Sequence, residues 1–125
     1  MNIDLTNFTA LQSAALFDLL ILAMYADDQL TTAAEKHLQP LFVALGLVEA
    51  ADRQREFDAA VTRLHPSIQS IHKARTQAIL LAEAFTLRSQ QKKVYEAIEQ
   101  IMSANNHVTS WEGMLLMELR MKFRL

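Results

Sequence analysis

The sequence predicts an all-α fold: a single-domain bundle of about six helices over residues 1–125, with an internal helix–loop–helix pseudo-repeat. Three observations support this expectation. Only two Gly and two Pro occur in 125 residues, and these are the residues that break helices. β-branched residues are few and scattered, so strands have little support. Finally, the hydrophobic fraction of 51% beside 21% charged residues is typical of a globular chain with a core.

The first expected helix covers residues 7–26. From Leu16 to Met24 it is apolar on nearly all sides, which predicts a place at the centre of the bundle. The apolar run AALFDLLILAM has 11 residues and contains Asp18, whereas a membrane span needs about 20 apolar residues. We therefore expect a core helix, no transmembrane segment, and an Asp18 side chain at the rim that pairs with Lys or Arg.

The second helix is expected to start near Thr31 or Thr32 and to run to about Leu45. The pair Asp27-Asp28 ends the helix before it. Gly46 is the expected residue after its last turn, because glycine adopts a left-handed conformation without Cβ strain.

The third and fourth helices are expected over residues 49–64 and 68–87. His65-Pro66 separates them, and Ser67 is the expected cap of the fourth helix. The predicted core face of the third helix consists of Phe57, Ala60, Val61 and Leu64. The predicted buried side of the fourth consists of Ile68, Ile71, Ala78, Leu81, Ala82 and Phe85.

The fifth and sixth helices complete the bundle. A break near Arg88-Ser89 precedes the fifth, which runs to Ala104 with an apolar stripe of Val94, Ile98, Ile101 and Met102. The sixth starts after Thr109 and runs almost to the last residue. Thr109-Ser-Trp-Glu112 has the pattern of a capping box at its start.

Several classes of function are disfavoured. The chain has no cysteine, which excludes disulfides, thiolate metal sites and cysteine nucleophiles and favours a reducing, cytoplasmic location. A net charge of −2 argues against nucleic-acid binding. The start MNIDLTNFT lacks the features of a signal peptide. No nucleophile elbow or Gly-rich phosphate loop occurs, and the four histidines have no zinc-site spacing, so we do not expect an enzyme.

A helix–loop–helix unit occurs twice, at an offset of 78 residues. The joint YADDQLTTAAE at 25–35 parallels SANNHVTSWEG at 103–113. The same offset pairs Leu16 with Val94, Asp18 with Glu96, Met24 with Met102, Thr31 with Thr109, and Leu38, Leu41 and Leu45 with Leu116, Leu119 and Phe123. We expect the two copies to pack about a pseudo-two-fold axis. The alternative is a chance likeness between two amphipathic helix pairs.

The first joint is a candidate site for a divalent cation. Asp27, Asp28 and Glu35 offer carboxylate oxygens of the kind that Ca²⁺ and Mg²⁺ prefer. Three carboxylates need backbone carbonyls and water to complete a tight site, and the spacing of an EF-hand loop is missing. The alternative is that the Asp pair only ends one helix and prepares the next.

The last helix carries a candidate partner surface. Met114, Met117 and Met121 recur at i, i+3 and i+7, and apolar residues cover the adjacent sides of the helix. One interpretation is core packing. The other is a Met-rich surface for a protein partner or a second copy of the chain, since methionine adapts to irregular surfaces.

The stretch LFDLLILAMYADDQLTTAAEKHLQPLFVALGL resembles the tellurite-resistance protein TerB and the wider TerB-like helical domain, also found at the N-terminus of membrane-anchored DjlA-type co-chaperones. Residues 12–47 and 90–123 carry the resemblance. In that family an apolar helix ends in Ala-Asp-Gly, followed by a variable residue, an aliphatic residue, Ser or Thr, and a Glu. This pattern occurs twice.

The resemblance implies a non-enzymatic binding or scaffolding domain in a bacterial stress response, with acidic joints that bind a divalent cation. It also implies assembly with partners near the inner membrane, as a peripheral component. By position, the implied cation ligands are Asp27 in the first joint and Glu112 in the second. Asp28 and Asn106 stand where the family has Gly. Asn105 stands where it has Asp, so the second joint has lost its carboxylate.

Overall fold

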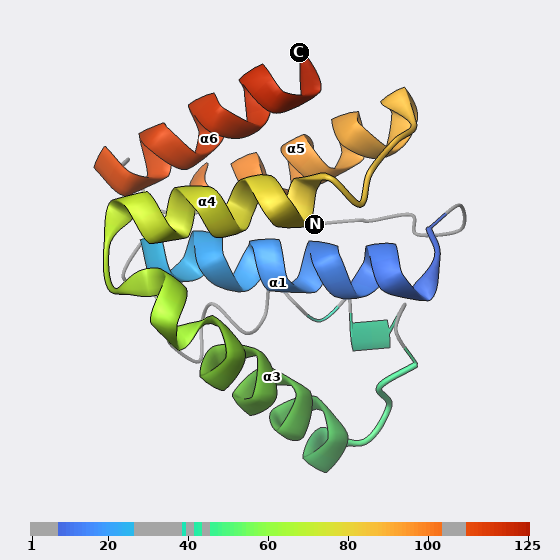
Figure 1. Cartoon of the computed structure of the whole chain (residues 1–125). Coiled ribbons are helices and arrows are strands. Elements are labelled where there is room, and N and C mark those ends of the chain that lie inside the picture. Colours follow the sequence, from blue (N-terminus) through green and yellow to red (C-terminus); the bar gives the residue numbers. More distant parts are fainter. Residues whose placement is uncertain (1–7, 27–38, 40–41, 44–45, 104–109) are drawn as a thin grey trace.

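The computed structural model describes all residues except 1–7, 27–38, 40–41, 44–45 and 104–109. Within the described residues the chain is an all-α bundle with five α-helices and no strand, which confirms the predicted fold class (Figure 1). The elements are α1 (Ala10–Ala26), α3 (Ala50–Leu64), the short 3₁₀ helix η1 (His65–Ile68), α4 (Ile71–Ala82), α5 (Arg88–Ser103) and α6 (Ser110–Phe123).

Helix α1 forms the centre of the bundle, as its apolar sequence predicts. It packs against α3, α4, α5 and α6, and every side chain from Ala15 to Ala23 is buried. The helix begins at Ala10, so the expected start at residue 7 is wrong. Thr9 Oγ1 accepts from the Gln12 N–H at 3.1 Å, and Gln12 Oε1 accepts from the Thr9 N–H at 3.0 Å. This reciprocal capping box satisfies two orphan donors and fixes the first turn.

The residues around Gly46 confirm the predicted end of the second helix. Most of that helix lies outside the described residues, but Gln39, Phe42 and Val43 are helical. Gly46 has a φ of +77°. The N–H of Gly46 donates to Val43 O at 3.0 Å, and the N–H of Leu47 donates to Phe42 O at 2.9 Å. Both bonds together form a Schellman motif, in which glycine takes the left-handed position.

Helix α3 buries the predicted face, but the region that follows differs from expectation. Ala60 and Leu64 are fully buried, and Phe57 and Val61 pack partly buried against the core. Residues 65–68 then form η1, with Pro66 in its first turn. A 3₁₀ turn accommodates the proline without a lost hydrogen bond. Ser67 therefore does not cap the next helix.

Helix α4 is shorter than the predicted 68–87. Ser70 caps it, because its Oγ accepts from the Lys73 N–H at 3.1 Å, and the helix ends at Ala82. Its buried row consists of Ala74, Ala78 and Ala82. Ile71, expected on the buried side, is 38% exposed, because the row of alanines four residues apart takes the positions that face the core.

Helices α5 and α6 cover the remaining sides of the bundle. Val94 and Ile98 of α5 are buried as predicted, whereas the side chains of Ile101 and Met102 lie outside the described part. Leu115, Leu119 and Phe123 of α6 point into the core. α6 also packs on α4, and two ion pairs join them: Arg75 Nε to Glu118 Oε1 at 3.0 Å and Lys122 Nζ to Glu83 Oε1 at 3.6 Å.

Candidate functional site

The predicted cation joint stays a prediction. Asp27, Asp28 and Glu35 lie outside the described residues, as do Asn105 and Asn106 of the second joint. Glu112 is part of α6, but its side chain is not among those described. Across the described ranges, no group of three or more His, Asp or Glu side chains is arranged to hold a metal ion.

A pair of glutamines, one buried and one partly buried, joins the two helices that start the predicted repeat units. Gln12 of α1 and Gln90 of α5 are 78 positions apart, the same offset that aligns the two units. Gln12 Nε2 donates to Gln90 Oε1 at 3.1 Å, and Gln90 Nε2 donates to Gln12 Oε1 at 3.1 Å. Equivalent residues that exchange identical bonds are what a two-fold axis between them produces. The glutamine pair agrees with the expected pseudo-two-fold axis between α1 and α5, which stays a prediction.

The N-terminal ends of α1 and α5 match at the same offset. α1 starts at Ala10 and α5 at Arg88, which are also 78 positions apart. In α1 the Gln12 carboxamide accepts from the N–H of Thr9. In α5 the Gln90 carboxamide accepts, through a longer contact of 3.5 Å, from the N–H of Leu87. Leucine has no hydroxyl, so the second copy keeps only one half of the capping box.

The C-terminal ends of the two units also match. Arg124 lies 78 positions after Gly46 and has a φ of 56°. Its N–H donates to Met121 O at 3.2 Å, and the Leu125 N–H donates to Arg120 O at 2.9 Å. These bonds repeat the Schellman motif of Gly46 at equivalent positions. An arginine in the left-handed region is uncommon, and sequence reasoning missed it, although the 78-residue offset placed it on Gly46.

The side chain of Arg88 supports this second helix end. Its guanidinium donates to the carbonyl oxygens of Phe123 and, at 2.8 Å, of Arg124. Carbonyls at a helix C-terminus lack intrahelical donors and carry the negative end of the helix dipole. A cation that donates to them stabilises the end of α6, so the start of α5 holds the end of α6 in place.

The predicted pairing of Asp18 is confirmed, and its partner is Arg63 of α3. Arg63 Nε donates to Asp18 Oδ2 at 3.1 Å, and Nη2 donates to Oδ1 at 2.5 Å. Asp18 is 7% exposed, so the expected place of its side chain at the rim is wrong: it is buried. The hydrogen bond to Asp18 raises the pKa of the Arg63 guanidinium above its ordinary value. The raised pKa contributes stability that is fully present at any pH below the ordinary pKa of arginine. This stability is lost only when the pH rises through the raised pKa, so it is constant over the pH range in which proteins are usually studied.

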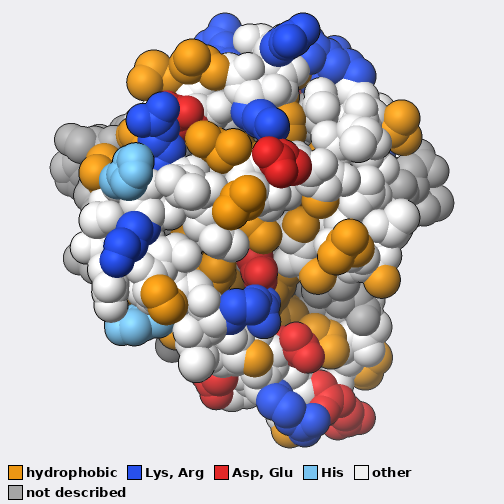
Figure 2. All heavy atoms as spheres, viewed as in Figure 1, with side chains coloured by type: hydrophobic (Ala, Val, Ile, Leu, Met, Phe, Trp, Pro, Cys, Tyr) orange, Lys and Arg blue, Asp and Glu red, His pale blue; other side chains and the backbone are white. Residues whose placement is uncertain are grey.

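The methionines of α6 do not share one environment. Met114 is partly buried against the core, whereas Met117 is 55% exposed and Met121 is 66% exposed. Figure 2 shows that hydrophobic side chains reach the surface between Lys and Arg side chains over α4 and α6. Leu80 of α4 is also 55% exposed. The core interpretation therefore applies to Met114, and two methionines remain available as a surface.

No family model, curated protein or solved structure matches the chain. In the described part of the chain, none of the helices has the length and apolar character needed to cross a bilayer. The fold and the glutamine pair thus define a structural class: an all-α bundle in which a glutamine pair joins two helix units.

Proposed function

We propose that the chain is a TerB-like domain that acts as a non-enzymatic binding or scaffolding module in a bacterial stress response. The observation that carries the proposal is the exposure of Met117 and Met121 on a helix whose opposite side is buried in the core. Methionine side chains are unbranched and polarizable, which suits a surface that adapts to a partner. The matched helix ends at the 78-residue offset support a duplicated helix pair of the TerB-like kind. We place the protein in the cytoplasm.

The partner surface is tested first with the chain itself. We expect the wild-type chain to self-associate at high concentration in sedimentation velocity. Met117→Glu should shift it to monomer, because a carboxylate at the centre of an apolar contact is desolvated without a counter-charge. Leu11→Glu is the control, since Leu11 is an exposed leucine on another helix, α1. That variant should associate as the wild type does.

Two outcomes would count against this assignment. Equal loss of association in both variants would mean that the surface is not centred on α6. A wild-type monomer at every concentration would exclude a second copy of the chain as the partner. The remaining partner would then be a different protein, including one held at a membrane complex.

The second candidate function is a divalent-cation-responsive module. It rests on the sequence of the first joint, where Asp27, Asp28 and Glu35 supply charged oxygens. The second joint has Asn105 and Asn106 instead, and a neutral carbonyl oxygen binds a hard cation more weakly than a carboxylate. We propose that only the first joint keeps a cation.

Calcium should therefore raise the melting temperature of the wild-type chain, because a ligand that binds only the native state stabilises it. At a concentration of about 100 times the Kd, the expected gain is about 2.7 kcal/mol. Asp27→Asn should abolish the rise. Without Ca²⁺ this variant should be as stable or slightly more stable, since Asp27 directly follows in sequence the last residue of α1, where the helix dipole is negative.

The control for the cation test lies in the second joint. Asn105→Gln keeps a neutral amide there and should leave the Ca²⁺ response unchanged. Trp111 lies beside that joint in sequence, so its fluorescence should report little of Ca²⁺ binding. Titration calorimetry that detects no heat with Ca²⁺, Mg²⁺ or Mn²⁺, together with an unchanged melting temperature, would remove the cation function.

A further inference from the structure

Helix α3 is attached to the molecule differently from the other helices. Figure 1 shows it below α1, away from α4, α5 and α6. Among the described elements it packs mainly on α1 and η1. Only Ala60 and Leu64 of its 15 residues are fully buried. The free energy that apolar burial contributes to holding α3 in place is therefore small compared with that of α1.

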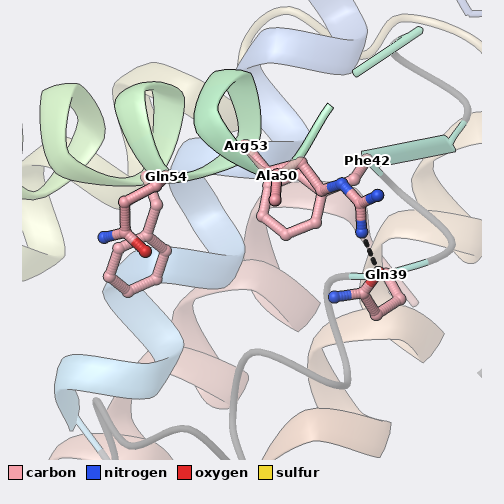
Figure 3. Close-up of a pocket in the computed structure, with 6 residues that line it drawn as sticks. Gln39, Phe42, Ala50, Arg53 and Gln54 are labelled. Atoms are coloured by element: carbon pink, nitrogen blue, oxygen red, sulfur yellow. Dashed lines mark hydrogen bonds between the residues drawn. The ribbon is translucent and has the colours of Figure 1, made fainter. Parts of the chain in front are cut away.

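The inner side of α3 is incompletely packed. One cavity of about 150 Å³ lies beside its first two turns and is lined by Gln39, Phe42, Ala50, Arg53, Gln54 and Phe57 (Figure 3). A second cavity of about 190 Å³ lies between α3 and α1 and is lined by Ala14, Phe17, Leu47, Glu56 and Arg63. Both pockets are open to water, so the side chains that line them pack against protein on fewer sides. Two such pockets along one helix reduce the apolar area that α3 buries against the bundle.

Polar groups hold α3 at both ends. At its start, Arg53 Nη1 donates to Gln39 Oε1 at 2.8 Å and Nη2 donates to Val48 O at 2.6 Å, as Figure 3 shows for Gln39. The Nε of Arg53 is buried and has no hydrogen-bond partner among the described residues. A buried donor without a partner costs free energy that water would recover. At its end, Arg63 forms the ion pair with the buried Asp18 of α1.

We propose that α3 is a cover that opens as a unit from the apolar side of α1 and that the Arg63–Asp18 ion pair holds it closed. Both of its junctions are suited to this motion: the non-helical residues after Gly46 at one end, and the 3₁₀ turn with Pro66 at the other. Opening hydrates Asp18 and the Arg53 Nε and uncovers Phe17, while α1, α4, α5 and α6 stay packed. Such sub-global openings require less free energy than global unfolding. This device goes beyond the proposed binding function and does not depend on it.

Two single-thiol variants test the opening directly. The chain has no cysteine, so one introduced thiol gives an unambiguous signal. Ala60 of α3 and Ala78 of α4 are both 0% exposed, and each thiol can react with an aromatic disulfide reagent only when its helix opens. Under native conditions Ala60→Cys should react at least about tenfold faster than Ala78→Cys. Equal reaction rates would overturn the proposal, because both thiols would then report global unfolding.

The ion pair is tested by adding Arg63→Gln to both thiol variants. This change leaves the Asp18 carboxylate buried without its cation, which opening relieves. It should speed the reaction of Ala60→Cys by about tenfold. The reaction of Ala78→Cys should speed up by no more than that, because global unfolding starts from the same closed state. The control is Arg75→Gln, which removes an ion pair of similar exposure between α4 and α6. It should leave the reaction of Ala60→Cys unchanged.

Each other outcome contradicts the proposal. If Arg75→Gln speeds the reaction of Ala60→Cys as much as Arg63→Gln does, that thiol reports global unfolding and α3 does not open as a unit. If Arg63→Gln speeds neither thiol, the ion pair does not hold α3 closed. Hydrogen exchange on the unmodified chain gives an independent reading, in which amides of α3 should exchange faster than those of α1 and α4. Exchange of α3 in step with α1 would refute the opening without any variant.

Discussion

Leu20→Ala is expected to lower the free energy of unfolding by about 3–5 kcal/mol, among the largest effects of any single change in the chain. Leu20 is 0% exposed and lies in the centre of α1, where helices pack on several sides. Because neighbours on all sides are fixed by other contacts, the cavity left by the removed atoms cannot collapse. Denaturant unfolding of the variant, analysed at a fixed slope, measures the loss.

The repeat supplies a matched comparison for this prediction. Ile98 occupies the position equivalent to Leu20 at the 78-residue offset and is 1% exposed in α5. Ile98→Ala should therefore cost an amount in the same range, about 2–5 kcal/mol. Leu11→Ala, at an exposed position of the same helix α1, should cost less than about 0.5 kcal/mol. A small effect at Leu20 beside a large one at Leu11 would contradict the central place of α1.

The second large effect is expected at the glutamine pair. Gln12→Leu removes both bonds that Gln12 exchanges with Gln90, and the carboxamide of Gln90 stays buried at 3% exposure. The loss of these bonds from a buried polar group should cost about 1–3 kcal/mol. Gln90→Leu breaks the same two mutual bonds and should also lower the free energy of unfolding.

A double-mutant cycle separates the pair from its surroundings. Gln12→Leu combined with Gln90→Leu should cost less than the sum of the single changes, with a coupling energy of about 0.5–3 kcal/mol. The reason is that each single change already breaks both mutual bonds, which the double change can break only once. Additive single effects would mean that the two glutamines act independently.

The central helix and the pairing of Asp18 could be predicted from the sequence because they depend on local composition. Nine successive buried positions leave no alternative place for α1, and a lone carboxylate in such a helix needs a counter-charge. The identity of that counter-charge could not be predicted. Arg63 lies 45 positions away, and its approach depends on how α3 crosses α1.

The boundaries of α4 could not be predicted for a different reason. Ser67 and Ser70 are equally good caps by residue type. The choice between them depends on Pro66, which favours a 3₁₀ turn over residues 65–68 and moves the start of α4 beyond it. Two of the three buried alanines, Ala78 and Ala82, were predicted on the buried side, and only Ala74 was not. The row of small side chains allows α4 to approach its neighbours closely.

The candidate site was predicted in part. The 78-residue offset contains Gln12 and Gln90, but glutamine is not a residue type that marks a core contact, so the pair was not singled out. The exposure of Met117 and Met121 agrees with the surface interpretation, and the burial of Met114 agrees with the core interpretation. The methionine stripe of α6 therefore contributes one side chain to the core and two to the surface. The cation joint lies outside the described residues and stays a prediction.

A crystal structure of the whole chain grown with Ca²⁺ tests the duplicated helix pair most directly. We expect residues 10–47 to superpose on residues 88–125 by a rotation of about 180° about an axis between Gln12 and Gln90, the angle that a two-fold axis requires. Gly46 should fall on Arg124, and a helix should run from Thr31 or Thr32 to Leu45. A different crossing angle in the two units, or a non-helical segment before Gly46, would contradict the account.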